Sequence, residues 1–183
     1  EDTLGIVAAI VMTIQVIVLI VSIFPTEIAL KKTFNDDGTV KRQLIELIDK
    51  NEMRKTYKIY KHCMFMATEE KFNIKVDQYL NDNSVKIFAC FEQDEVLGVM
   101  VVSFIEQKKI EIIGIAVNSS VRGKGIGSYM INQVVNDYGL LSVYAETDND
   151  AVGFYRNNDF SIVEFSEIYG DEPVVRYKCE LTE

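Results

Sequence analysis

The chain is poor in the residues that build metal centres and disulfide frameworks. Its 183 residues include no tryptophan, two prolines, one histidine and three cysteines. Cys63, Cys90 and Cys179 are odd in number and far apart, without a Cys-x-x-Cys pair, so they match neither a disulfide framework nor a zinc site. His62 alone cannot supply a histidine-rich metal centre. We therefore expect no metal, and the cysteine usage is typical of a reducing compartment.

Basic residues are also scarce. Lysine and arginine number 19 against 28 aspartates and glutamates, which gives a net charge of −9 and a pI near 4.7. A nucleic-acid binder needs a basic surface to meet phosphates, so we expect no nucleic-acid partner. Apolar residues make up 48% of the chain, which excludes a largely disordered protein, and the length suits one ordinary domain with a short extension.

One long apolar run stands near the start of the chain. Leu4 to Phe24 carry no charged side chain, and a helix of that length would span roughly 31 Å, about the thickness of a bilayer core. Lys31 and Lys32 follow the run and acidic residues precede it, so the positive-inside rule predicts a cytoplasmic domain anchored to the membrane. Without a basic segment before the run, a cleaved signal peptide fits less well. The alternative is a helix that packs on protein, in a soluble cytoplasmic molecule.

The rest of the chain predicts a mixed α/β domain. Pro25 ends the apolar run, so we divide the chain into a hydrophobic helix with its linker, residues 1–38, and a domain, residues 39–183. Periods of two and of 3.6 residues alternate in the domain, which predicts a central mixed sheet of about six to seven strands flanked by helices. The expected strands cover 39–45, 85–91, 96–105, 110–117, 140–146, 160–169 and 174–181, and the expected helices cover 49–64, 68–80, 125–138 and 151–157.

A glycine-rich turn links a strand expected to be buried on both faces, 110–117, to the next helix. Val121 to Ser128 reads Val-Arg-Gly-Lys-Gly-Ile-Gly-Ser, and such a turn aims backbone N–H groups and a helix N-terminus at one place, where phosphate oxygens bind. A P-loop fails because Asn118 stands where its first glycine would be, and a Rossmann fingerprint fails because Ser128 replaces its third glycine. By itself the turn fits a structural link equally well.

The turn and a second segment together resemble the GNAT superfamily of acetyl-CoA-dependent N-acetyltransferases. The pyrophosphate loop of that family, Q/R-x-x-G-x-G/A, is matched by Arg122, Gly125 and Gly127, and the stretch from Asn149 to Tyr155 resembles its segment N-x-x-A-x-x-F-Y. The order of expected strands and helices matches as well, so the resemblance covers residues 39–183. One departure is Asp159, where the family usually has glycine; aspartate tolerates a left-handed turn better than most residues.

The resemblance implies a binding site for acetyl-CoA as co-substrate, with no metal. The end of the central strand would pair with the pantetheine arm like an added strand, and a backbone N–H near Ala116 or Val117 would polarise the thioester carbonyl. Lys124 would contribute its backbone N–H more than its charge. The expected cofactor-binding residues are Ile115, Ala116, Val117, Arg122, Gly123, Lys124, Gly125, Ile126, Gly127, Ser128, Asn149 and Tyr155.

Two residues are candidates for proton transfer. The amine must lose a proton before it attacks the thioester, and the departing thiolate gains from receiving one. The resemblance implies that Tyr155 is this acid; its alternative role is a packed aromatic beside Phe154. Glu111 lies where histone acetyltransferases of the superfamily carry their base, and the isoleucines on either side would desolvate it. The alternative is that Glu111 is an ordinary solvated carboxylate and that a water chain acts as the base.

The sequence leaves two functions open. The first is transfer of acetyl from acetyl-CoA to a primary amine, a small molecule or peptide that the acidic domain would favour if cationic. The second is a non-catalytic acyl-CoA-binding or sensing module, tethered by its N-terminal helix. The tract Tyr57–Met66 falls where the family often shapes its acceptor pocket, although it fits a core segment equally well. A homodimer is a further expectation, because GNAT-like proteins often dimerise.

Overall fold

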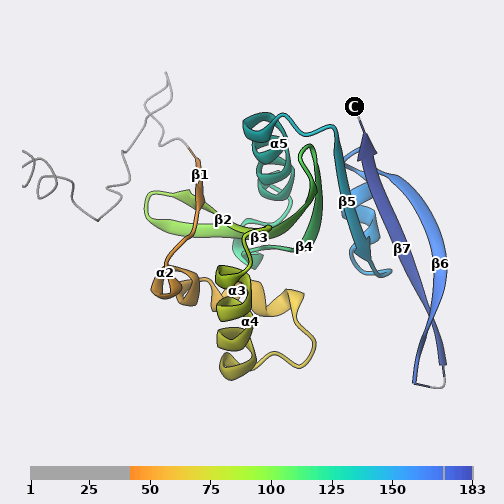
Figure 1. Ribbon diagram of the computed structural model, residues 1–183, viewed down its shortest axis with the longest axis horizontal. Helices are drawn as coiled ribbons and strands as arrows, with labels where there is room; N and C mark the ends of the chain where they lie inside the picture. The colour runs from red at the N-terminus through yellow and green to blue at the C-terminus, as the bar shows by residue number, and fades with distance from the viewer. Residues whose placement is uncertain (1–41, 171, 183) are drawn as a thin grey trace, which may run out of the picture. The chain divides into compact units, whose positions relative to one another are not determined.

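The computed structural model describes residues 42–170 and 172–182, which form a seven-stranded mixed sheet with helices on its faces (Figure 1). The expected hydrophobic helix at 4–24 and its linker lie outside these residues. In the described part of the chain, no helix combines the length and apolar character needed to cross a bilayer. The strands are β1 (Gln43–Glu46), β2 (Val85–Glu92), β3 (Glu95–Glu106), β4 (Lys109–Val117), β5 (Ser142–Thr147), β6 (Ser161–Tyr169) and β7 (Glu172–Thr182). The helices are α2 (Lys50–Lys55), α3 (Tyr57–Tyr60), α4 (Glu69–Asn81), α5 (Ile126–Tyr138) and α6 (Val152–Arg156), with short 3-10 turns η1 (Lys61–Cys63) and η2 (Ser119–Val121).

The sheet confirms the expected mixed α/β architecture. Its strand order is β1-β2-β3-β4-β5-β7-β6. Every neighbouring pair is antiparallel except β4 and β5, which run parallel because α5 crosses over between them. This parallel pair lies in the middle of the sheet, so the two halves of the molecule meet there.

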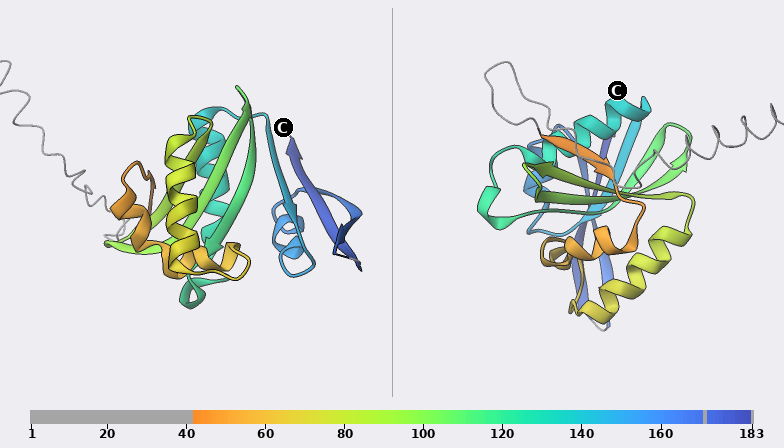
Figure 2. Two further views of the ribbon diagram at one scale, coloured as in Figure 1. Left: turned by 60° about the horizontal axis from the view of Figure 1, so that its bottom comes forward. Right: turned by 90° about the vertical axis from the view of Figure 1, so that its left-hand side faces the viewer.

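Two apolar cores lie on opposite faces of the sheet (Figure 2). Helices α5 and α6 cover one face, where Met130 and Tyr155 pack against Ile110 and Ile112 of β4. Helices α2, α3 and α4 cover β1 to β4 on the other face, where the core includes Phe72. Glu111, between Ile110 and Ile112 in β4, therefore turns toward the second face, since side chains alternate along a strand.

The helix ends follow ordinary capping rules. Thr68 accepts the backbone N–H of Lys71 at the start of α4, as expected for a threonine N-cap. Gly139 ends α5 in the left-handed conformation, with φ of 56°, which glycine adopts without strain. The start of α4 and the end of α5 each lie within one residue of the position that the sequence predicts.

The first expected helix is broken, and Thr56 is the reason. The sequence predicts one helix over 49–64, but the structure has α2, α3 and η1 in its place. Thr56 is fully buried and its hydroxyl donates to the Met53 carbonyl at 2.6 Å. A threonine hydroxyl that bonds a nearby carbonyl competes with the regular helical pattern, and here the chain changes direction between α2 and α3.

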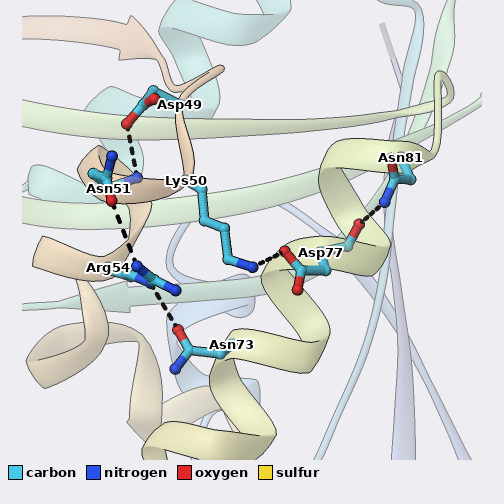
Figure 3. Close-up of polar contacts among 7 residues, drawn as sticks. All are labelled: Asp49, Lys50, Asn51, Arg54, Asn73, Asp77 and Asn81. Atoms are coloured by element: carbon cyan, nitrogen blue, oxygen red, sulfur yellow. Dashed lines mark hydrogen bonds and ion pairs between the residues drawn. The ribbon is translucent and has the colours of Figure 1, made fainter.

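Helices α2 and α4 are joined by polar side chains at the surface (Figure 3). Lys50 forms an ion pair with Asp77, and Arg54 donates to the Asn73 amide oxygen at 3.2 Å. Beneath them the rings of Tyr57 and Phe72 lie 5.2 Å apart. Exposed ion pairs contribute little to stability, so the apolar core beneath, which includes Met53 of α2 and Phe72 of α4 together with residues of the sheet, holds these helices in place.

Strand β4 is not buried on both faces as the sequence predicts. Ile113 has 38% of its surface exposed, and the pairing with β3 skips it, because Val101 pairs with Gly114 and Val102 pairs with Ile112. Before this one-residue bulge, even-numbered residues of β4 face the core under α5 and α6; after it, odd-numbered residues do. Apolar letters alone cannot reveal such a bulge, since the residue that leaves the ladder is itself an isoleucine.

Candidate active site

The two central strands separate halfway along their length. Pairs between β4 and β5 run only from Lys109–Ser142 to Ile112–Ala145, although β4 continues to Val117 and β5 to Thr147. Figure 2 shows the two strands spreading apart beyond this point. The bulge at Ile113 lies where the pairing stops. The last residues of β4 therefore present a backbone edge that no described strand pairs with.

The direction of the backbone groups on this edge follows from the pairing with β3. The Asn118 N–H donates to the Leu97 carbonyl at 2.8 Å, and successive residues of a strand turn their N–H groups to alternate sides. Ala116 therefore faces β3, whereas Ile115 and Val117 face the unpaired edge. Of the two residues that the family resemblance offers as the polarising N–H, only Val117 points the right way.

The sulfur of Cys63 lies against the same edge. It accepts a hydrogen bond from the Ile115 N–H, and burial raises the pKa of this thiol to about 11 although that bond opposes the shift. Gly114 makes the approach possible, because an added Cβ there would lie 2.8 Å from the Tyr60 hydroxyl and 3.2 Å from the Cys63 Cβ. Among the predicted site segments, Tyr60 and Cys63 appear only in the tract Tyr57–Met66, and neither of them, nor Gly114, is predicted to make contact at this edge of β4. Their contact joins segments about 50 residues apart, and no local pattern signals it.

The glycine turn opens onto solvent at the start of α5. Gly123 and Gly125 have φ of 76° and 74°, and an added Cβ would meet no atom within 4 Å at either position. Gly125 is the N-cap and supplies no side-chain hydrogen bond, so the first backbone N–H groups of α5 have no helical acceptor. The glycines are therefore required by backbone conformation, and they leave the donors accessible.

The remaining residues of the turn take different positions. Lys124 and Arg122 are exposed, and the Arg122 Nε donates to the Val117 carbonyl at 3.4 Å, which ties the turn to the end of β4. Ile126 is buried in the core and Ser128 is half-buried. The structure therefore gathers the expected phosphate-binding residues and the β4 edge at one place, with Ile126 present as a core residue.

Helix α6 lies directly against the start of α5. Gly127 is buried, and an added Cβ would lie 2.7 Å from Cε2 and 2.9 Å from Cζ of the Phe154 ring. The third glycine of the turn is thus a packing glycine. It brings the segment that contains Tyr155 next to the glycine turn, as the resemblance implies.

The turn that leads into α6 is closed by Asp148, which the sequence analysis did not single out. Its carboxylate accepts the backbone N–H groups of Asp150 and Ala151 at 3.0 and 3.2 Å. Counted back from Ala151, the family pattern N-x-x-A begins at Asp148, so the match of its first position to Asn149 is wrong and an aspartate stands there. Asn149 is exposed, and its amide oxygen accepts the Tyr177 hydroxyl at 2.7 Å.

Tyr155 is buried in the core beneath the separating strands. Its ring is 4% exposed and packs on Phe154 and Phe160, each at 5.2 Å between ring centres. Burial raises the pKa of its hydroxyl well above the ordinary value, and the neighbouring thiols of Cys179 and Cys63 raise it further. Among the described residues the hydroxyl has no hydrogen-bond partner. It therefore stays protonated at neutral pH and is free to donate.

Glu111 points to the other face of the sheet from Tyr155. It is half-buried between Ser103 of β3 and Tyr144 of β5, whereas Ile110 and Ile112 turn into the opposite core. The expected isoleucine surroundings are therefore wrong. The residue that borders Glu111 is a tyrosine, because alternation sends the isoleucines away.

Further carboxylates share this face of the sheet. The Tyr144 hydroxyl donates to Glu146, and Tyr144 pairs across the ladder with Glu180 of β7. Burial raises the pKa of Tyr144, and the charges of Glu146 and Glu111 raise it further. This face therefore carries Glu111 and Glu146 near the place where the strands separate, with Lys178 opposite Glu146 in the ladder, whereas Glu180 forms an ion pair with Lys109 at 3.5 Å.

Comparison with known proteins agrees with this geometry. Residues 53–160 match the family model described as the acetyltransferase (GNAT) family. No curated protein sequence matches the chain. The matched segment includes the β4 edge, the glycine turn and α6, and it makes up more than half of the 183 residues.

Solved structures share the fold at low sequence identity. A GNAT-family protein from Desulfovibrio desulfuricans superposes with a TM-score of 0.62 at 16% identity, over 78% of this chain and 99% of that one. A variant of the spermidine N-acetyltransferase SpeG from Vibrio cholerae gives 0.62 at 15% identity, over 77% and 93%. The protein smu.2055 from Streptococcus mutans gives 0.61 at 15% identity, over 76% and 98%. These likenesses concern the fold, and with the family match they establish that this chain belongs to the GNAT family of acetyltransferases.

Proposed function

We propose that the protein transfers acetyl from acetyl-CoA to a primary amine that attacks the thioester directly. The observation that carries this proposal is the unpaired edge of β4 beside the open glycine turn of α5. An extended pantetheine arm would complete the sheet at that edge, as an added strand does. The pyrophosphate would then meet the free N–H groups at the start of α5.

The residues present fit this co-substrate. A phosphate group needs close approach to backbone donors, and the space around Gly123 and Gly125 is free of other atoms. The Val117 N–H and carbonyl lie on the unpaired edge, and the Ile115 N–H beside them is held by Cys63. We therefore assign Val117 as the donor that polarises the thioester carbonyl.

Tyr155 is the proposed acid. When bound, the thioester supplies the activated acyl group, and its sulfur leaves as a thiolate that benefits from a proton. The uncommitted hydroxyl of Tyr155 supports this role. Burial raises its pKa, which keeps the proton in place but makes the group a weaker acid than an ordinary tyrosine, so the charge of the departing thiolate must offset the effect of burial. An acid with a high pKa holds its proton until strong negative charge develops close by.

Glu111 is the proposed base, with a water chain as the alternative. Its half-buried carboxylate lies on the opposite face of β4 from Tyr155. This arrangement suits an amine that approaches from one side while the thiolate leaves on the other. A proton can then be removed and supplied by separate groups without interference.

A cationic amine is the proposed acceptor. Glu111 and Glu146 share the face from which the amine would approach, where Glu180 is already paired with Lys109, and the whole chain has a net charge of −9. Carboxylates along the approach raise the local concentration of cations. SpeG, with which the chain shares its fold, is a spermidine N-acetyltransferase, and a polyamine fits the same electrostatic demand.

Three further expectations from the sequence remain proposals. A non-catalytic acyl-CoA-binding or sensing module would use the same edge and turn, but it would not need the free hydroxyl of Tyr155. Anchoring through residues 4–24 and assembly into a homodimer remain predictions.

The test of this function is acetyl transfer itself. The protein would be incubated with acetyl-labelled acetyl-CoA and a panel of primary amines that spans neutral, singly charged and polycationic molecules. We expect label on the amine, with the highest kcat/KM for polycations. Tight binding of acetyl-CoA without transfer to any amine would instead support the sensing module.

A further inference from the structure

The loop between η1 and α4 carries two large apolar side chains on its surface (yellow in Figure 1). Phe65 is 89% exposed, the highest value among the large apolar side chains in the described ranges, and Met66 beside it is 70% exposed. Met66 has φ of 46°, a left-handed conformation that is uncommon for a residue other than glycine. Lys71 donates to the Met66 carbonyl at 3.3 Å. The loop is thus fixed in a conformation that presents both side chains to solvent.

Positive charge surrounds this loop in an otherwise acidic chain. From residue 54 to residue 75 there are six lysines and arginines against two glutamates, whereas the whole chain has a net charge of −9. Lys58 and Lys61 are exposed and form no ion pair with any described residue. We call the following set the basic corner: Lys58, Lys61, Phe65, Met66, Lys71 and Lys75.

The two parts of the basic corner are held together by the core beneath it. The Tyr57 ring packs on Phe72 of α4 at 5.2 Å, so α3 and α4 keep a fixed relation. Lys58 and Lys61 come from the α3–η1 side, and Lys71 and Lys75 lie one turn apart on α4. Cations therefore stand on both sides of the apolar pair along the chain. The exposed carboxylates Glu69 and Glu70 lie between Met66 and Lys71, and the Lys75 ammonium lies 5.6 Å from the centre of the Tyr79 ring.

We propose that the basic corner docks on a bilayer surface that carries anionic headgroups. Phe65 and Met66 enter the headgroup region, while the lysines remain at the level of the lipid phosphates. A bilayer supplies both an apolar layer and a negative surface, which this combination of side chains requires. The acidic remainder of the chain is repelled by the same surface, so the charge distribution selects this corner and fixes the orientation.

The proposal is compatible with the predicted anchor but does not depend on it or on acetyl transfer. The exposed lysines and apolar side chains of the basic corner by themselves select the face of the domain that meets the bilayer.

The absence of tryptophan from the chain makes the test direct. Phe65→Trp places a single fluorophore in the basic corner of the full chain, and Tyr169→Trp places one at the β6–β7 hairpin, where Tyr169 is 59% exposed. Each variant is mixed with vesicles of phosphatidylcholine alone or with phosphatidylserine added. We expect a blue shift and quenching by brominated lipid for Phe65→Trp with phosphatidylserine, and neither for Tyr169→Trp. If Phe65→Trp does not fold, Met66→Trp serves as the probe.

Charge reversal separates docking at this corner from general adhesion. Adding Lys58→Glu and Lys61→Glu to Phe65→Trp is expected to weaken the response to phosphatidylserine vesicles by about tenfold or more. Three results would overturn the proposal: no response to anionic vesicles, equal responses from both probes, or a response unchanged by charge reversal. A probe that shifts with acetyl-CoA and amine but not with vesicles would assign the loop to the acceptor site instead.

Discussion

At the scale of single residues, removing the hydroxyl of Tyr155 distinguishes a role in catalysis from a role in packing. Its ring is buried between Phe154 and Phe160, but the hydroxyl bonds no described residue. Tyr155→Phe should therefore leave the free energy of unfolding nearly unchanged while kcat falls about 10²-fold or more, because the thiolate leaves without a proton. The measurement is kcat together with urea unfolding. Unchanged kcat in a folded variant would remove Tyr155 as the acid.

Tyr79→Phe is a matched control, because it removes a buried hydroxyl that is hydrogen-bonded and has no proposed role in catalysis. Tyr79 is also buried, and its hydroxyl bonds the Tyr60 hydroxyl at 3.3 Å. Tyr79→Phe should cost about 1 kcal/mol of stability and leave kcat close to that of the unmodified protein. A fall in kcat as large as that of Tyr155→Phe would show that loss of packing suffices to explain both.

Glu111 gives a prediction about the base. If its carboxylate removes the proton from the amine, Glu111→Gln should lower kcat about 10²-fold or more. Glu146→Gln is the control, since Glu146 lies on the same face but is more exposed. An equal loss of kcat in both variants would favour a water chain, with the carboxylates acting only through charge.

At the scale of elements, the contact between α5 and α6 depends on one missing methyl group. Gly127→Ala would place a Cβ 2.7 Å from the Phe154 ring, so one helix must move. We expect a loss of about 1–3 kcal/mol in the free energy of unfolding and weaker binding of acetyl-CoA. Gly153→Ala is the control, because nothing lies within 4 Å of it and alanine favours a helix. Equal stability of the two variants would contradict the close contact.

The elements also show where sequence reasoning succeeds and where it stops. Period and capping residues predict α4, α5 and most strand bounds, because Thr68 and Gly139 act through their own backbone neighbours. The break at Thr56 and the bulge at Ile113 are not predictable in this way. Each depends on how the segment packs against the sheet, and the same letters would suit a regular helix or strand.

Some residues of the candidate site are predictable from local sequence, and others are brought together only by the fold. The glycine turn and Tyr155 are recognisable because their spacing is local and the family pattern is known. Cys63 at the Ile115 N–H is not, since the two residues meet only when α3 and η1 pack on β4. Spacing counted from Ala151 could have identified Asp148 as the first residue of the family pattern, whose carboxylate accepts the N–H groups of the turn before α6.

At the scale of the whole molecule, buried tyrosines make stability fall in alkaline solution. Burial raises the pKa of Tyr60 and of Tyr155, so the folded protein keeps these protons above about pH 10, where the unfolded chain releases them. The unfolded state then binds fewer protons, and the free energy of unfolding falls as pH rises, by about 1.4 kcal/mol per pH unit for each tyrosine. Urea unfolding across this range should show a smaller slope for Tyr155→Phe. An identical slope would mean that Tyr155 titrates normally in the folded protein.

The most direct test of the account is calorimetric titration of the protein with acetyl-CoA, alone and with two glycine variants. Gly125 and Gly139 both have left-handed backbones in open space, at opposite ends of α5. Alanine should strain both positions similarly, but only Gly125 borders the proposed phosphate site. We predict micromolar binding for the unmodified protein and for Gly139→Ala, and at least tenfold weaker binding for Gly125→Ala. No binding by the folded, unmodified protein would contradict the assignment of the β4 edge and the glycine turn to acetyl-CoA.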